Sequence, residues 1–268
     1  MLKDITLGQY YPSDSKIHSL DPRIKIISAI LLMISVFFCK SVLSFMFLIA
    51  VNIILIIMSK ISFYSIFKAL KPVLFLVVFT ALINIFLTGG EDYLFKWKFI
   101  SITVNGVKSA VIMALRIVIL VSVTSLLTFT TSPIRLTDGI ESLLKPFSKI
   151  GLPAHELAMM MTIALRFIPT LLEETDKIIM AQKSRGADFE SGNIIKRAKA
   201  LIPILVPLFI NSFRRADELA TAMECRCYRG GTGRTKLVEL KIHSIDVFSV
   251  IICLAIVAIT VFLGVNGL

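Results

Sequence analysis

Two short turns that contain arginine are the residues of this sequence whose types and spacing suggest chemistry. The first is Ser184-Arg185-Gly186 and the second is Cys225-Arg226-Cys227, and each follows a long, partly apolar segment. The guanidinium group of arginine is a rigid fork of five N–H donors that binds carboxylate and carbonyl oxygens together. Two such turns favour docking onto acidic partner surfaces, although an arginine at a helix end also offsets the dipole of its own helix.

The segments before both turns have the spacing of amphipathic helices, because one stripe of positions recurs at intervals of three and four. These positions are Leu171, Thr175, Ile178 and Gln182 in the first segment, and Phe209, Phe213, Ala216, Ala220 and Met223 in the second. Pro203 and Pro207 lie inside the second apolar run and predict a kink or break there. The sequence therefore predicts two helical arms, each with an arginine at its tip.

Residues for catalysis, metal binding or nucleotide binding do not form a recognisable pattern. The three histidines are scattered, and Cys225 with Cys227 supplies only two of the four ligands of a structural zinc site. Residues 230–235 are rich in glycine but lack the Gly-x-x-x-x-Gly-Lys-Ser/Thr phosphate loop. We therefore predict no catalytic residue, no metal, no cofactor and no ATP hydrolysis by the chain itself.

The composition places the arms in a membrane protein. The 268 residues are 56% hydrophobic and have a mean hydropathy of +0.85, which is too apolar for a soluble domain. The formal charge is +11, but basic residues are interleaved with acidic ones and form no stripe with stacking aromatics. We therefore expect contact with a lipid bilayer and no binding of nucleic acid.

Five apolar segments are predicted to cross the membrane as helices. They are residues 26–39, 41–59, 72–87, 107–130 and 247–263. The first is short against the roughly 20 residues that a spanning helix needs, so we interpret the first two as a hairpin that turns at Lys40. The predicted fold is all-α and polytopic: a membrane region with four spans at 1–130, helical coupling segments at 131–245, and a last span at 246–268.

The distribution of lysine and arginine predicts which loops are cytoplasmic. The N-terminal segment carries 4 of these residues, residues 60–71 carry 3 and residues 131–245 carry 17, against 3 in the opposite loops. Positive residues concentrate on the cytoplasmic side of membrane proteins. The N-terminus and the coupling segments are therefore expected in the cytoplasm, and Leu268 outside.

A nearly unbroken apolar helix is predicted at 154–168, inside the coupling region. It contains Met159, Met160 and Met161, and methionine packs adaptably against changing partners. Met159, Met160 and Ile163 are therefore candidate contacts for a partner protein. Burial of this helix against the chain's own bundle is the alternative interpretation.

A polytopic membrane enzyme that acts on a lipid or peptide is the alternative function. Catalysis within the membrane would leave polar residues clustered in the spans, yet only Asn84, Lys108 and Arg116 qualify. Arg116 lies deep in the fourth span, and we interpret it as paired within the bundle. An autonomous channel would need a polar path, which these spans lack.

Four strings of residues carry a resemblance to a known family. They are Gly151-Leu152-Pro153, Ala164-Leu165-Arg166-Phe167-Ile168-Pro169, Ser184-Arg185-Gly186 and Met223-Glu224-Cys225-Arg226-Cys227-Tyr228-Arg229-Gly230-Gly231. With them, essentially the whole chain resembles the transmembrane T component of energy-coupling factor (ECF) transporters, the EcfT/CbiQ family. Members of this family belong to ABC-type importers for vitamins and transition metals.

The resemblance implies a non-catalytic coupling subunit of an importer in a bacterial or archaeal cell membrane. Its expected partners are two cytosolic ABC ATPases and a separate substrate-binding membrane protein, the S component. The resemblance assigns ATPase docking to Ser184, Arg185, Gly186, Cys225, Arg226 and Cys227. The S component would specify which vitamin or metal is carried.

The sequence departs from the family pattern in both turns. Ser184 replaces an alanine, which exchanges one small residue for another, while Cys225 and Cys227 stand where alanine and glycine are usual. Glycine adopts the left-handed conformation at a helix end easily, and cysteine does not. We therefore expect the second arm to continue about one residue further towards Gly230.

Overall fold

The computed structural model describes residues 10–39, 41–87, 93–97, 100–151, 153–189, 193–230 and 240–265. The chain divides into two compact units. We call residues 8–139 with 239–268 the membrane unit, and residues 140–238 the arm unit.

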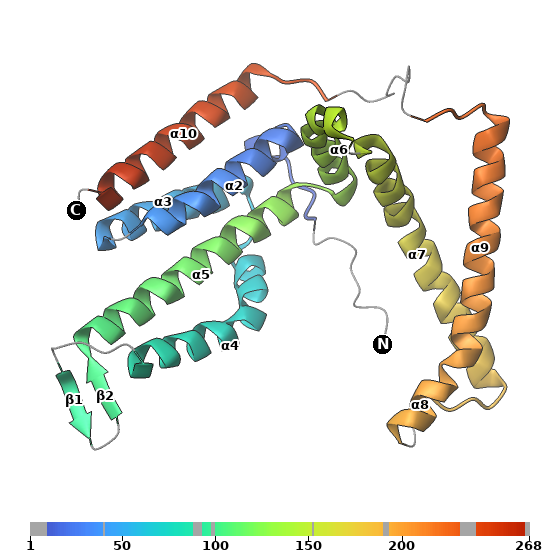
Figure 1. The fold of residues 1–268 in the computed structure, drawn as a ribbon, viewed down its shortest axis with the longest axis horizontal. Helices are drawn as coiled ribbons and strands as arrows, with labels where there is room; N and C mark the ends of the chain where they lie inside the picture. Colours follow the sequence, from blue (N-terminus) through green and yellow to red (C-terminus); the bar gives the residue numbers. More distant parts are fainter. Residues whose placement is uncertain are drawn as a thin grey trace. The chain divides into compact units, whose positions relative to one another are not determined.

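The membrane unit is built from helices that pack side by side (Figure 1). They are α1 (Lys16–Ser19), α2 (Pro22–Phe38), α3 (Val42–Ser59), α4 (Phe63–Leu87), α5 (Val104–Thr130), the first part of α6 (Pro133–Leu144), and α10 (Ser244–Val265). A short antiparallel hairpin of β1 (Tyr93–Trp97) and β2 (Ile100–Thr103) joins α4 to α5. The predicted all-α polytopic class is confirmed, with this small hairpin as an addition.

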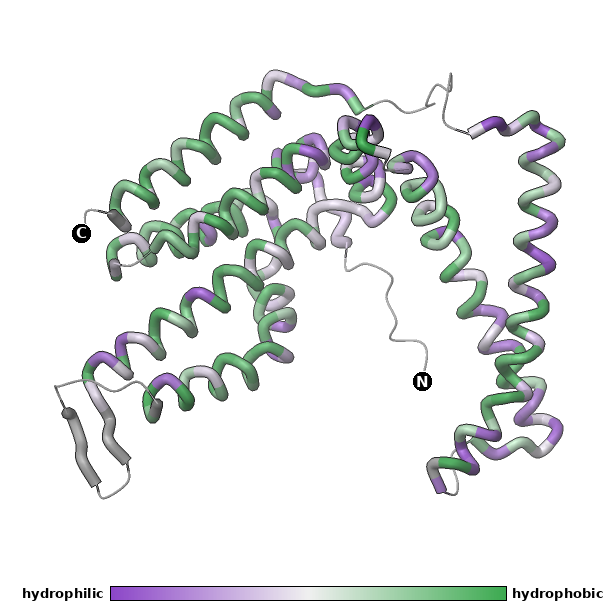
Figure 2. Tube along the Cα trace, in the orientation of Figure 1, coloured by the Kyte–Doolittle hydropathy of each residue, from purple (hydrophilic) through white to green (hydrophobic). Residues whose placement is uncertain are grey.

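Apolar side chains from α2, α3, α5 and α10 form the core of the membrane unit. Val36, Phe45 and Ile119 are at most 4% exposed and belong to one cluster with Cys253. Figure 2 shows that these helices are apolar over most of their length, and many of their large apolar side chains are exposed. Helices that are apolar all round are typical of a bilayer environment.

Five helices of the described residues are long and apolar enough to cross a membrane, namely α3, α4, α5, α10 and α7 (Ala154–Ser184). The number agrees with the prediction, but the membership differs. Helix α2 has 17 residues, which fits the prediction that the first segment is short, while α7 was assigned to the coupling region. Helix α4 begins at Phe63, well before the predicted start, and is bent (Figure 1). Pro72 lies inside it, and proline is a common cause of such a bend.

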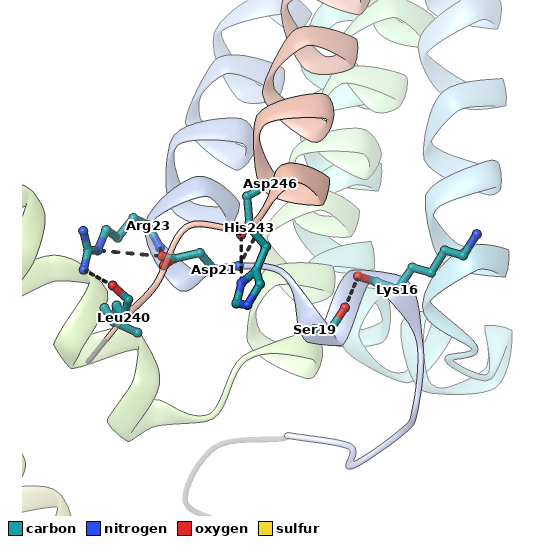
Figure 3. A network of polar contacts seen from close by, with 7 residues as sticks. All are labelled: Lys16, Ser19, Asp21, Arg23, Leu240, His243 and Asp246. Carbon is teal, nitrogen blue, oxygen red and sulfur yellow. Dashed lines mark hydrogen bonds and ion pairs between the residues drawn. The ribbon is translucent and has the colours of Figure 1, made fainter. Parts of the chain in front are cut away.

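Helices α2 and α10 run parallel, with their ends in register. At their N-terminal ends, Asp246 Oδ1 accepts a 2.8 Å hydrogen bond from Asp21 N, and Oδ2 accepts a 2.7 Å bond from His243 N (Figure 3). At their C-terminal ends, a Cβ added to Gly264 would lie 2.3 Å from the carbonyl oxygen of Phe38, so only glycine permits this approach. The segments that precede α2 and α10 therefore lie at the same end of the membrane unit.

Lys25 joins three segments at the end of the membrane unit where α2 and α10 begin. Its Nζ donates 3.0 Å hydrogen bonds to the carbonyl oxygens of His18 and Thr130, the last residue of α5. We call this the basic end, because it carries Lys16, Arg23, Lys25, Lys60, Arg135 and Lys241.

Arg116 has a partner inside the membrane unit, as the sequence interpretation required. Its guanidinium carbon lies 5.5 Å from the centre of the Phe37 ring, which is a cation–π contact between α5 and the end of α2. Its Nη1 also approaches Met113 Sδ at 3.9 Å. These contacts give Arg116 a structural role in packing two helices.

Candidate functional site

The first arm is α7, a single helix of 31 residues that ends at Ser184. Pro169 lies inside it without breaking it. After Ser184, Gly186 adopts a left-handed φ of +84°. Ala187 N then donates to Gln182 O at 3.0 Å, and Gly186 N donates to Lys183 O at 3.0 Å. This pair of bonds is the Schellman motif, which places Arg185 at the C-cap.

The second arm is α9 (Ile202–Cys225), which follows the short α8 (Ile194–Ala200). The break predicted from the prolines is confirmed between α8 and α9, where Pro203 occupies the first turn of α9 and Pro207 lies within it. The prediction that α9 would continue beyond its arginine turn is wrong. Cys227 itself adopts the left-handed conformation, with φ +55°, and the helix ends at Cys225.

The two arm tips have the same backbone hydrogen bonds. Tyr228 N donates to Met223 O at 3.0 Å and Cys227 N donates to Glu224 O at 2.8 Å, which repeats the Schellman motif of the first arm. Arg226 therefore occupies the same C-cap position as Arg185. The last carbonyl groups of both helices are capped by backbone N–H groups, so neither guanidinium group is needed for capping.

Both arginines are exposed and available to a partner. Ser184, Arg185, Gly186, Cys225, Arg226 and Cys227 are all exposed. Neither arginine forms an ion pair with any residue that the structure describes. Within the described chain, no group of three His, Cys, Asp or Glu side chains is placed to hold a metal ion.

A polar contact between the arms was not predicted. Glu174 of α7 accepts a 2.6 Å hydrogen bond from Asn211 Nδ2 and forms a 3.0 Å ion pair with Arg215 Nη2, both on α9. We call Glu174, Asn211 and Arg215 the brace. Glu174 and Asn211 are 37 residues apart, so no local sequence pattern indicates their contact. Each arm extends ten residues beyond the brace, or about 15 Å at helical rise.

The arms also carry exposed apolar side chains. Met160 is 55% exposed, while the two other predicted contacts, Met159 and Ile163, are half-buried. On α9, Phe209 and Phe213 are 66% and 58% exposed and pack edge to face, with ring centres 4.7 Å apart. We call four exposed side chains of α9, namely Leu205, Phe209, Ile210 and Phe213, the apolar arm surface. Exposed apolar residues gathered in this way are typical of protein or membrane contacts.

The conformation of Cys227 leads to a testable prediction. Because a left-handed conformation costs an L-residue about 1 kcal/mol more than glycine, Cys227→Gly is expected to stabilise the end of α9 by that amount. Hydrogen–deuterium exchange at the last amides of α9 should then slow by roughly fivefold. Cys225→Gly is the matched control, because glycine within a helix is destabilising and should accelerate exchange. Equal exchange in both variants would contradict the cap geometry.

Comparison with known proteins places the chain among transporter components. A family model described as "Cobalt transport protein" (CbiQ) matches residues 13–237. A protein of Clostridium kluyveri named energy-coupling factor transporter transmembrane protein EcfT is 58% identical over 262 residues, which cover 97% of each chain. Proteins of the same name from Acidaminococcus fermentans and Macrococcus caseolyticus are 56% and 46% identical, with at least 98% of each chain covered.

Proposed function

This chain belongs to the CbiQ family and is a transmembrane component of the energy-coupling factor transporters, and from that premise we propose the role that it has in such a transporter. It transmits ATP-driven motion of two cytosolic ATPase subunits to a separate substrate-binding membrane subunit, and so supports uptake of a vitamin or a transition metal. The observation that carries the proposal is the pair of exposed arginines at equivalent C-caps, one on each arm.

Each arginine would dock into a groove of one ATPase. A groove lined by carboxylates and carbonyl oxygens matches the planar fork of the guanidinium group. The Schellman motif supports this role, because it fixes the direction in which the chain leaves each helix and leaves the arginine side chain unused. The brace supports transmission, since it joins the arms by an ion pair and a hydrogen bond.

The proposal makes the chain a non-catalytic platform, with hydrolysis in the partners. Its direct test is affinity purification of the tagged chain in mild detergent, followed by identification of the co-purified proteins. Two ATPase subunits and a small membrane protein are expected. A solitary chain that turns over a lipid or peptide would instead identify a membrane enzyme.

The apolar arm surface and Met160 are proposed to contact the substrate-binding subunit. Met160→Asp is expected to reduce recovery of that subunit by about tenfold or more while both ATPases stay bound, because burying a carboxylate without a partner costs at least 1–3 kcal/mol. Thr162→Asp is the matched control, because Thr162 is also exposed but points about 200° away around α7. Equal recovery with both variants would remove Met160 from the contact.

The basic end is proposed to lie in the cytoplasm, because positive residues mark that side. In a chain whose native cysteines are replaced by serine, Ser62→Cys and Ala222→Cys should be protected from an impermeant thiol reagent in intact cells. Asp92→Cys, in the connection between α4 and β1, should react. Permeabilised cells provide the control, in which all three positions are labelled. Labelling of Ala222→Cys in intact cells would reverse the topology.

A further inference from the structure

The membrane unit contains an open cavity of about 870 Å³ with an almost entirely apolar wall. Buried side chains of α2, α5 and α10 form its floor: Ala29, Leu32, Val123, Leu126 and Cys253. The volume falls within the range of about 300–1,000 Å³ that small-molecule sites occupy. The cavity is therefore large enough for one acyl chain.

The cavity opens to the outside of the membrane unit at a rim formed by α3 and α10. The lining residues Ile54, Ile245 and Phe248 are 54%, 58% and 65% exposed. Both helices are long and apolar enough to cross a membrane, so this opening faces the bilayer. The occupant can therefore enter sideways from the hydrocarbon layer.

The cavity reaches the basic end, where two lysines line it. Lys25 is only 7% exposed, and its Nζ donates to two carbonyl oxygens. An ammonium group has three N–H donors, and no described residue accepts the third. Lys16 is exposed and forms no ion pair with a described residue. The polar end of the cavity thus offers unused positive donors.

Asp246 and Asp21 lie close enough to Lys25 to interact with its charge, but neither accepts a hydrogen bond from its Nζ. Asp246 accepts bonds from two backbone N–H groups, and Asp21 Oδ1 accepts a 2.9 Å bond from Arg23 N. Asp14 is on the exposed N-terminal segment and does not line the cavity. An anion from outside the chain is therefore the acceptor that fits.

We propose that this cavity binds an anionic phospholipid, with an acyl chain along the apolar wall and the phosphate at Lys16 and Lys25. Basic pockets between membrane helices bind anionic lipid head groups. A zwitterionic lipid would bring its own cation beside the two lysines, and an apolar helix of a partner would leave both lysines without an acceptor. An anionic lipid provides both an acyl chain for the apolar wall and a negatively charged acceptor for the lysines at the basic end.

Fluorescence quenching by brominated lipids tests the proposal in the full chain. The single tryptophan is removed by Trp97→Phe, and Phe248→Trp places a probe on the exposed rim of the cavity. Phe75→Trp is the matched control, because Phe75 is 78% exposed on α4 and does not line the cavity. Each chain is reconstituted in phosphatidylcholine vesicles that contain a variable fraction of brominated phosphatidylglycerol or brominated phosphatidylcholine.

Half-maximal quenching of the Phe248→Trp probe is expected at a roughly fivefold lower mole fraction of the anionic lipid than of the zwitterionic lipid. The Phe75→Trp probe should respond equally to both lipids. Lys16→Gln should remove the preference and Lys16→Arg should retain it, while Lys108→Gln, a lysine outside the cavity lining, should leave it unchanged. Circular dichroism that matches the parent chain shows that each variant is folded.

Three results would overturn the proposal. Equal quenching by both lipids at Phe248→Trp would mean that the cavity holds ordinary bilayer lipid. A lack of quenching there, with normal quenching at Phe75→Trp, would mean that protein covers the cavity. Loss of the preference in millimolar inorganic phosphate would mean that the lysines form a simple anion site.

Discussion

Replacing both tip arginines, Arg185→Ala together with Arg226→Ala, is expected to release the ATPase subunits from the purified complex or to uncouple their hydrolysis from uptake. Removing one partner of a buried, hydrogen-bonded charge pair costs roughly 2–5 kcal/mol, because the other charge is left unpaired. With both sites altered the loss is about 4–10 kcal/mol if the sites are independent. Co-purification of the ATPases and substrate uptake measure the two consequences.

Single and conservative variants separate docking from an effect on the helix dipole. With one arm still docked, the ATPases should stay bound while uptake falls. Arg→Lys at either tip keeps a cation at the helix end, so a dipole effect of about 0.3–1 kcal/mol would survive, whereas bidentate docking would not. Arg214→Ala is the control, because Arg214 is an exposed arginine of α9 away from the tip. Wild-type co-purification and uptake in the double variant would refute docking.

Asp246→Ala is expected to lower the stability of the membrane unit more than any other single change considered. Its carboxylate is 1% exposed and accepts hydrogen bonds from Asp21 N and His243 N. Removing it leaves two N–H groups without an acceptor, at about 1–3 kcal/mol each. The melting temperature of the purified chain in detergent, followed by loss of the monodisperse peak on size-exclusion chromatography, should fall by several degrees.

A graded series checks that the hydrogen bonds cause this effect. Asp246→Asn keeps one carbonyl oxygen as an acceptor and should lose less stability than Asp246→Ala. Asp217→Ala, which removes an exposed carboxylate of α9, should leave the melting temperature within about 1 °C of the parent. An Asp246→Ala protein as stable as the parent would show that this contact does not hold α2 and α10 together.

Much of the fold was predictable because the length of an apolar segment is a local signal. The apolar runs of α3, α5 and α10 identify these helices directly. The start of α4 at Phe63 was missed, because Lys68, Lys71 and Pro72 interrupt the apolar pattern, although the helix accommodates all three. The brace was missed because its residues lie on two helices that are far apart in the sequence, so no local pattern indicates their contact.

The arginine tips show where reasoning from single residues failed. Their position at helix ends followed from the amphipathic spacing and the small residues beside them. The behaviour of Cys227 did not, because its conformational preference argues against the φ of +55° that it adopts. Two backbone hydrogen bonds, from Cys227 N and Tyr228 N, accompany that conformation and stabilise it. The cost of that conformation, about 1 kcal/mol, is no larger than the roughly 1–3 kcal/mol that two hydrogen bonds contribute.

The equal length of the arms beyond the brace has a mechanical consequence. Counted from Glu174 to the end of α7 and from Arg215 to the end of α9, each arm has ten residues, about 15 Å, so a rotation of 10° about these residues would displace either tip by about 2.6 Å. If the two tips dock onto two ATPases as proposed, equal radii would make the torque from both partners equal for equal force. Such a lever has no mechanically dominant side, and shortening one arm by a helical turn, about 5.4 Å, would bias the stroke towards the other ATPase.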